Sequence, residues 1–286
     1  MSAIDSNQNL STLTFGVFAD PQYCDCEPDT ELNRYFRKTA VKLEKCISHL
    51  NQNQQLNFVI GLGDLIDDGF KSFETVNQIL GQSNKKLFHV AGNHDFEVKK
   101  ENLDKVYAQL GLENDKYYSF IKSGWQFIFL DGNEITFNSN ELNVVAQAEQ
   151  ITRKLKAENQ PNFGEYNGGI SQTQLHWLEN QLQTAKEKRL KTVIICHYPL
   201  LPLTKYSLWN SDEIWSVISK YKNVKFWLNG HHHDGNYTLQ NDVHFLTMKA
   251  MVDTENETAF AEISLSDNKI EIKGFGREIS RSLEIK

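Results

Sequence analysis

Side chains that bind divalent metal ions recur at five places in the sequence. One is NGHHHDG at residues 229–235, where more than 50 residues follow the three histidines, so they are not a terminal purification tag. The others are DPQ, GDLID, GNHD and CHYP, and the polar residues of the five motifs are Asp20, Gln22, Asp64, Asp67, Asn93, His94, His197, His231, His232 and His233. Carboxylate and amide oxygens and imidazole nitrogens are the usual donors to divalent ions. Together the motifs predict a metal centre.

Each motif follows an apolar run that is typical of a buried strand. The runs are residues 13–19, 57–62, 86–91, 192–196 and 224–228, with a further one at 126–130. Helical spacing falls between most of them. Residues 30–50 predict a helix with Asp29 or Thr30 as its N-cap, and residues 171–182 predict another, opened by a capping box from Ser171 to Gln174. Because the carboxyl ends of strands in an α/β sheet share an edge at which ligands bind, we expect the motifs to meet there.

The rest of the chain predicts one α/β domain over residues 1–286, because no repeat or Pro/Gly-rich linker divides it. Residues 140–167 have the character of an insertion near the substrate side, part helix and part polar loop. Residues 243–248, 258–265 and 269–273 predict antiparallel strands that close a second sheet.

Taken in order, the motifs resemble the calcineurin-like metallophosphoesterases. The blocks of that family run Asp-x-His, Gly-Asp-x-x-Asp, Gly-Asn-His-Asp/Glu, His and Gly-His-x-His, and here they read DPQ, GDLID, GNHD, CHYP and GHHH. The match spans residues 20–233. It implies a four-layer αββα sandwich, in agreement with the strand and helix order.

The resemblance also implies two metal sites that share one ligand. Asp20, Gln22, Asp64 and His233 would hold one ion, and Asp64, Asn93, His197 and His231 the other. A hydroxide bridging the ions would attack phosphorus in line. His232 takes the free position between two ligands, and alternation along an extended segment would turn it away from the ions.

Two further residues are expected to take part in catalysis. His94 resembles the family histidine that faces the leaving oxygen, and Asp67 would orient it. For Asp67 a plain turn at residues 67–69 is the alternative. Gln22 stands where the family has histidine, and its hard amide oxygen favours Mn²⁺, or Mg²⁺, over Zn²⁺ or iron.

Longer stretches resemble the manganese-dependent ADP-ribose/CDP-alcohol diphosphatases. They include FGVFADPQY, RYFRK, YNGGISQTQLHWL, CHYPLLP, GHHHDGNY and GFGR. The resemblance implies hydrolysis of a nucleoside diphosphate linkage. Candidate substrate contacts are Tyr23, Arg34, Arg37, Asn167, Gly168 and Gly169, where the arginines would share one helix face and the glycines would offer backbone amides. A solvated helix face, an ordinary loop and a buried tyrosine are the alternatives.

Two other functions stay open at this stage. One is a cyclic-nucleotide or other phosphodiesterase on the same metal core. The other is a non-catalytic scaffold, although every ligand position holds a competent donor.

Composition narrows the partners. The net charge of −7 and the pI of about 5.7 argue against nucleic acid or an anionic membrane, and no obligate protein partner is evident. The polar start lacks the features of a signal peptide, and the apolar runs are too short to span a membrane. Cys24, Cys26, Cys46 and Cys196 are expected to be core or incidental thiols. These features predict a cytoplasmic protein.

Overall fold

The computed structural model describes residues 12–286, so most of the polar start, for which no signal peptide is expected, lies outside the described residues. Two six-stranded sheets form its centre, ordered β12-β11-β10-β1-β2-β3 and β4-β5-β6-β7-β9-β8. The strands are β1 Leu13–Phe18, β2 Leu56–Gly61, β3 Leu87–His89, β4 Tyr118–Lys122, β5 Trp125–Phe129, β6 Lys191–Ile195, β7 Val224–Asn229, β8 Asn236–Gln240, β9 Val243–Thr247, β10 Ala259–Leu265, β11 Lys269–Gly276 and β12 Arg281–Glu284. The helices are α1 Lys38–Gln52, α2 Ser72–Leu80, α3 Val106–Gln109, α4 Leu142–Ala157, α5 Gln172–Glu187 and α6 Ser211–Ile218, with short 3₁₀ turns η1 His94–Phe96 and η2 Lys100–Lys105.

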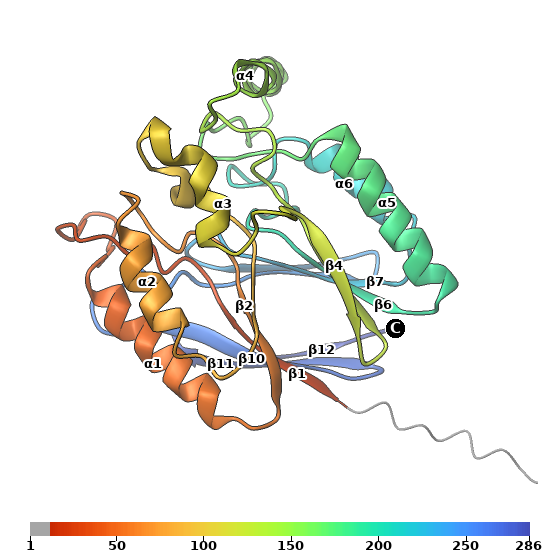
Figure 1. Ribbon diagram of the computed structural model, residues 1–286. Coiled ribbons are helices and arrows are strands. Elements are labelled where there is room, and N and C mark those ends of the chain that lie inside the picture. Colours follow the sequence, from red (N-terminus) through yellow and green to blue (C-terminus); the bar gives the residue numbers. More distant parts are fainter. Residues whose placement is uncertain (1–11) are drawn as a thin grey trace, which may run out of the picture.

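The sheets pack face to face and helices cover their outer faces (Figure 1). Phe15 and Phe58 of the first sheet meet Phe127 and Phe226 of the second in one buried cluster. A second cluster lies between the first sheet and α1 and α2, and a third lies between the second sheet and α5 and α6. This confirms the predicted four-layer αββα arrangement, because each sheet buries apolar side chains on both faces.

The predicted place of the C-terminal strands is wrong in part. They do not all close a second sheet: β9 joins the second sheet, parallel to β7, whereas β10 extends the first sheet antiparallel to β1 and β11 pairs antiparallel with β10. Strand alternation specifies which face is buried, but it does not specify which neighbour a strand pairs with.

The first predicted helix begins too early. Residues 30–37 form turns, and α1 starts at Lys38. The Asp29 carboxylate caps one of these turns by accepting from the amides of Glu31 and Leu32 (both 3.0 Å), and Asn33 has a positive φ of 58° that no helix allows. Leu32, which helical spacing from residue 30 would place on the buried face of the predicted helix, is 60% exposed.

The capping box at the start of α5 is confirmed in half. Ser171 Oγ accepts from the Gln174 amide at 3.1 Å. The Gln174 side chain does not return to the cap, and instead bonds both the amide and the carbonyl of Asp131.

The expected insertion contains α4, of whose residues only Ala148 is buried.

Two cysteine predictions need correction. Cys24 and Cys26 form a disulfide across one intervening residue, because the loop there brings their Cα atoms to 5.2 Å. Cys46 and Cys196 are buried thiols, as expected. The cysteines therefore give weaker support to a reducing compartment than the sequence indicated.

In the described part of the chain, no helix combines the length and the apolar character needed to cross a membrane.

Candidate metal centre

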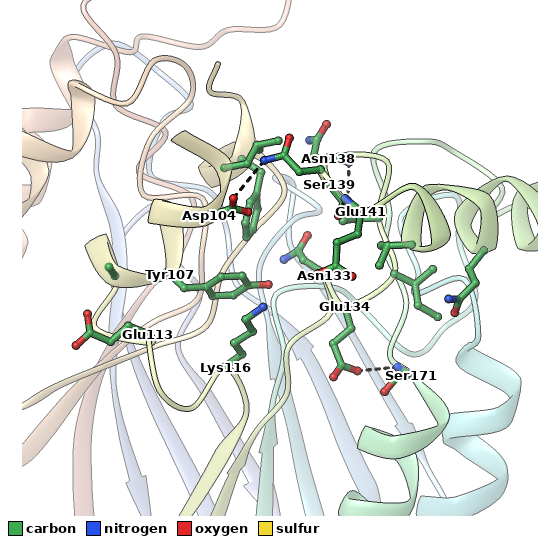
Figure 2. Close-up of a pocket in the computed structure, with 18 residues that line it drawn as sticks. Asp104, Tyr107, Glu113, Lys116, Asn133, Glu134, Asn138, Ser139, Glu141 and Ser171 are labelled. Carbon is green, nitrogen blue, oxygen red and sulfur yellow. Dashed lines mark hydrogen bonds between the residues drawn. The ribbon is translucent and has the colours of Figure 1, made fainter. Parts of the chain in front are cut away.

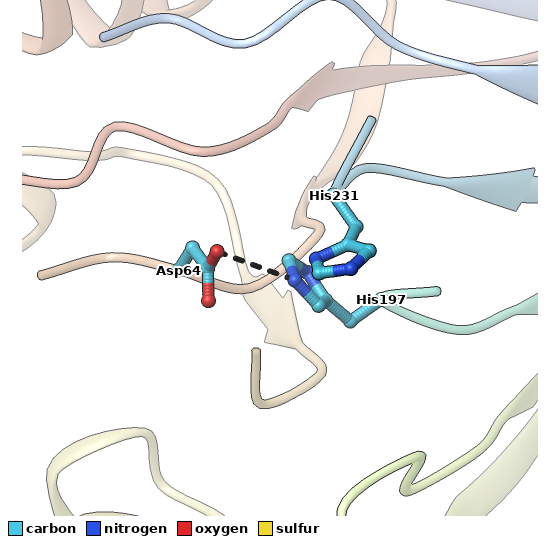
Figure 3. A group of neighbouring side chains, drawn as sticks. All are labelled: Asp64, His197 and His231. Carbon is cyan, nitrogen blue, oxygen red and sulfur yellow. Dashed lines mark ion pairs between the residues drawn. The ribbon is translucent and has the colours of Figure 1, made fainter. Parts of the chain in front are cut away.

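The predicted ligands meet where strands of both sheets end. Asp20 and Asp64 follow β1 and β2 of the first sheet, and His197 and His231 follow β6 and β7 of the second. Backbone bonds join the loops in pairs, from the Asp20 amide to Gly63 O (3.3 Å) and from the Gly230 amide to His197 O (3.0 Å). Candidate donor atoms of Asp64, His197 and His231 all lie within 4.8 Å of one another (Figure 3). The motifs therefore converge from two sheets rather than along one edge.

The backbone at the site is held in an unusual conformation. Asp20, Gln22, Asp64 and His231 all have positive φ, between 45° and 67°. Non-glycine residues avoid this region because Cβ crowds the following carbonyl, and each such residue costs about 1–3 kcal/mol. Four of the seven predicted ligands share this feature, which points to a site whose geometry is fixed at the expense of stability.

Two glycines of the motifs make room for the carboxylates. A Cβ on Gly92 would lie 2.1 Å from Asp64 Oδ1, and a Cβ on Gly230 would lie 2.5 Å from Asp20 Oδ2. Both contacts are impossible for a real side chain. The glycines of GNHD and GHHH are therefore needed because the carboxylates pack directly on their backbone.

Each of the three predicted histidine ligands is oriented by a hydrogen bond from one ring nitrogen. His197 Nδ1 donates to Leu62 O at 2.7 Å, and His233 Nδ1 donates to Asp253 Oδ1 at 2.9 Å. His231 donates from Nε2 to Asn167 Oδ1 at 3.0 Å. This fixes which nitrogen of each ring is left to bind an ion, as is usual for metal-binding histidines.

The prediction that an extended segment turns His232 away from the ions is wrong about the conformation of the segment. Residues 230–235 form bends and a turn rather than an extended segment, and His231 has a φ of 67°. The His232 ring instead stacks on Tyr206, with centroids 4.3 Å apart and planes at 23°. The His232 ring therefore makes an aromatic contact outside the cluster of predicted metal ligands.

The centre is charged and buried. Burial raises the pKa of Asp20 to about 6. Burial also acts on Asp64, but the charges of His197 and His94 outweigh it and hold the pKa of that carboxyl well below its usual range. For His197, burial opposes the charged form, yet Asp64 at 3.3 Å raises its pKa to about 9. An ion bound by His197 would displace the proton between these two side chains.

Gln22 tests whether the residues fit a metal ion. Its Nε2 donates to Asp64 Oδ2 (3.0 Å) and to His233 Nε2 (3.2 Å), while its buried Oε1 has no hydrogen-bond partner among residues 12–286. An orphaned buried carbonyl is costly. Rotation of the amide would place Oε1 beside the carboxylate and imidazole acceptors, where only a cation can satisfy all three. The donor set therefore fits a divalent ion.

The remaining predicted ligand and the predicted acid lie on one loop. Asn93 Oδ1 is 3.3 Å from His197 Nε2, and the His94 amide donates to Asp64 Oδ1 at 2.8 Å. His94 Nδ1 lies 3.2 Å from Asp67 Oδ1, an ion-pair distance whose angles do not meet those of a hydrogen bond. Burial raises the pKa of Asp67, and the nearby charges of His94 and Arg34 act against the increase.

Asp95 is a residue that sequence analysis missed. Its fully buried carboxylate accepts from the amides of Gly92 (2.9 Å), Asp64 (3.0 Å), Leu65 (2.8 Å) and Ile66 (3.3 Å). Asp95 thus ties the GDLID loop to the GNHD loop and fixes the position of Asp64. The only sequence feature that could have indicated this function of Asp95 is its place as the last residue of the GNHD motif.

The predicted arginine pair does not share a helix face, because Arg34 and Arg37 both precede α1. Arg37 is half-exposed and pairs with Asp25 and with Glu27 (2.7 Å). The backbone of Arg34 forms isolated β-bridges with Asp29 and Asp253. Its charge is close enough to Asp67 to affect the pKa of that carboxyl. Of the two, Arg34 is therefore the one beside the centre.

Most of the other predicted substrate contacts have partners within the chain. The amides of Asn167 and Gly169 donate to Gly164 O (3.1 Å) and Ile135 O (3.0 Å), and the Gly168 carbonyl accepts from the Trp209 amide. Tyr23 packs against the cluster under α1 and α2. The Asn167 side chain holds His231, so this residue acts on a ligand.

Two tyrosines beside His231 were not expected from the sequence. The Tyr166 and Tyr206 rings lie 5.9 and 5.8 Å from the His231 ring. Tyr166 is 43% exposed. Tyr166 opens the YNGGISQTQLHWL stretch, but its position beside His231 comes from packing between residues far apart in the chain, which the stretch alone does not signal.

A cavity of about 440 Å³ lies beside the centre but includes none of the predicted ligands (Figure 2). Tyr107, Lys116 and Glu134 line it, between α3 and the start of α4. Asn133 forms part of its wall, donating to Ala91 O (2.9 Å) and accepting from Tyr198 (2.6 Å). The cavity therefore adjoins the ligand loops without being the metal centre.

Comparison with known proteins defines the class. Residues 13–235 match the model of the calcineurin-like phosphoesterase family, and the chain belongs to that family. It is a metal-dependent phosphohydrolase.

Individual relatives share almost the whole chain. The manganese-dependent ADP-ribose/CDP-alcohol diphosphatase of Arabidopsis thaliana is 30% identical over 95% of this chain and 96% of its own length. The mouse protein of that name is 28% identical over 100% of this chain and 96% of its own. A dimetal phosphatase from Danio rerio has the same fold, with a TM-score of 0.83, 24% identity and coverage of 96% and 99%.

Proposed function

We propose that this chain hydrolyses the diphosphate linkage of ADP-ribose, CDP-alcohols or related nucleoside diphosphate compounds. The observation that carries the proposal is the clustering of Asp64, His197 and His231 at the ends of strands from both sheets. Hydrogen bonds join the other four predicted ligands, Asp20, Gln22, Asn93 and His233, to this cluster. The full-length similarity to diphosphatases of that name supports the substrate class.

Two divalent ions, Mn²⁺ above all, would be held by residues that share one carboxylate. Asp64 would be the shared ligand. The remaining donors would be Asp20, Gln22 and His233 for one ion and Asn93, His197 and His231 for the other. When bound, such a pair activates water and neutralises charge on the phosphoryl oxygens. Among the proposed ligands only Asp20 and Asp64 carry negative charge, so two divalent ions with their ligands would have a net positive charge that attracts an anionic diphosphate.

The chain also supplies a proton donor and an aromatic surface. His94 is 24% exposed at the side chain and would deliver a proton to the departing phosphate oxygen, with Asp67 holding its Nδ1 so that Nε2 faces the substrate. Arg34 would contact a phosphate. Tyr166, exposed beside His231, would give the base of the nucleoside an aromatic face for stacking.

A substrate comparison separates the proposal from its alternatives. With Mn²⁺ added, we expect ADP-ribose and CDP-choline to be cleaved to a nucleoside monophosphate and a phosphorylated alcohol or sugar, with kcat/KM well above that for cyclic AMP. Chromatography of the products measures this. Preference for cyclic AMP would favour a phosphodiesterase, and failure to cleave either these compounds or bis-p-nitrophenyl phosphate would favour a scaffold.

Gln22→His tests the basis of the metal preference. Imidazole nitrogen is a softer and more basic donor than an amide oxygen, so the variant is expected to bind Zn²⁺ more tightly and to depend less on added Mn²⁺. Metal content after dialysis and activity against added Mn²⁺ measure both effects. Unchanged metal selectivity would show that Gln22 does not set it.

We propose further that residues 1–286 form a single catalytic domain and that the protein is cytoplasmic.

A further inference from the structure

Residues 250–254 form a strap that lies against the metal centre. The Met251 and Val252 amides donate to Ala19 O (2.9 Å) and Asp20 O (3.0 Å), and the Ala250 amide donates to His233 O (3.1 Å). The strap therefore touches the loops of two predicted ligands of one ion, Asp20 and His233. It also carries Asp253, whose Oδ1 accepts from His233 Nδ1 at 2.9 Å.

A buried lysine holds this strap from the side of α1. Lys42 is 2% exposed, and its Nζ donates to three successive carbonyls, Val252 O (3.1 Å), Asp253 O (3.2 Å) and Thr254 O (2.9 Å). A buried ammonium is costly unless its donors are paired, and here all three are used. Burial, together with the Arg277 charge, lowers the pKa of Lys42 to about 8. The three bonds from Lys42 therefore fix the backbone position of the strap.

An arginine holds the strap from the side of β11. Arg277 belongs to GFGR, a stretch to which sequence analysis gave no role. Its Nη2 donates to Ala250 O and lies 3.7 Å from Asp253 Oδ2. The carboxylate of Asp253 thus lies between the imidazole of His233 and a guanidinium, and its side chain is only 12% exposed.

We propose that Lys42 and Arg277 are positioning residues that act on the metal centre through Asp253 and His233. Lys42 fixes the backbone of the strap and Arg277 fixes the free oxygen of the Asp253 carboxylate. The other oxygen then keeps the proton of His233 on Nδ1, so that the lone pair of Nε2 is directed at the ion. The inference rests on the proposed centre, and it assigns a function to two cations that touch no predicted ligand themselves.

The test uses Mn²⁺ binding rather than turnover. Arg277→Gln and Lys42→Met are expected to weaken binding of one of two Mn²⁺ equivalents by about 10–100-fold, the usual effect of losing a partner behind a metal ligand. Arg277→Lys should keep most of the affinity. Arg281→Gln is the matched control, because Arg281 has similar exposure (18%) but pairs with Glu278 at 3.1 Å. Equilibrium dialysis gives the dissociation constants, and thermal unfolding shows that each variant is folded.

A double variant isolates the route of the effect. If Arg277 acts through Asp253, Arg277→Gln added to Asp253→Asn should weaken Mn²⁺ binding little further. Wild-type affinity in Arg277→Gln, or an equal loss in Arg281→Gln, would overturn the inference while leaving the proposed centre intact. If Lys42→Met does not fold, the Arg277 and Asp253 variants decide. Failure of the wild-type chain to bind Mn²⁺ would overturn the proposed centre and this inference with it.

Discussion

His231→Ala and His233→Ala are each expected to lower kcat/KM by more than the roughly 10–100-fold that loss of a partner behind a ligand costs. Each removes a metal donor whose ring is held in place by a hydrogen bond that it donates to Asn167 or Asp253. The remaining donors would hold the affected ion loosely. Metal content measured beside activity should fall in both variants.

His232→Ala is the control that the chain itself provides. Its ring packs on Tyr206 outside the donor cluster, so kcat and metal content should stay close to those of the wild-type chain. An equal loss of activity in all three variants would contradict the assignment of His231 and His233 as the ligands.

His94→Asn is expected to lower kcat by about 10²–10⁴-fold, the range for loss of a general acid, with both metal equivalents retained. Asparagine is close in size to the proximal part of the ring but has no proton to transfer at neutral pH. The loss should shrink when the leaving group is p-nitrophenolate, which needs little protonation. Steady-state kinetics on a diphosphate and on bis-p-nitrophenyl phosphate compare the two cases.

Metal analysis decides between the functions of His94. The His94 amide donates to Asp64 at 2.8 Å, so the residue also has a structural contact at the centre. This contact comes from the backbone and survives in His94→Asn. If metal content falls together with activity, the residue is needed for the ions and is not the acid.

The fold, and the residues that come together at the candidate centre, could be predicted because both leave local signals. Buried strands such as β1 and β6 are short continuous apolar runs, and the motif after each strand is contiguous. The start of α1 could not be predicted in the same way. The spacing of Leu32 and Phe36 is helical, but Asn33 in the left-handed region and the turn capped by Asp29 stop the helix there.

The sequence could not reveal the residues that contact the centre from distant parts of the chain. Asp253 lies 20 residues from His233, and Lys42 reaches the strap across more than 200 residues. Nothing in their local sequences distinguishes them from surface charges. The turn conformation of residues 230–235 was missed for a similar reason, since the contact of His231 with Asp20 and Asn167 imposes it.

The most direct test of the central claim is the number of Mn²⁺ ions that the wild-type chain binds. Equilibrium dialysis, followed by assay of the dialysed protein with and without added Mn²⁺, gives both stoichiometry and dependence. We predict two equivalents, loss of activity on exhaustive dialysis and recovery of ADP-ribose hydrolysis when Mn²⁺ is restored. A chain that binds no more than one equivalent, or that retains zinc or iron and is indifferent to Mn²⁺, would contradict the two-ion centre built around Asp64 and Gln22.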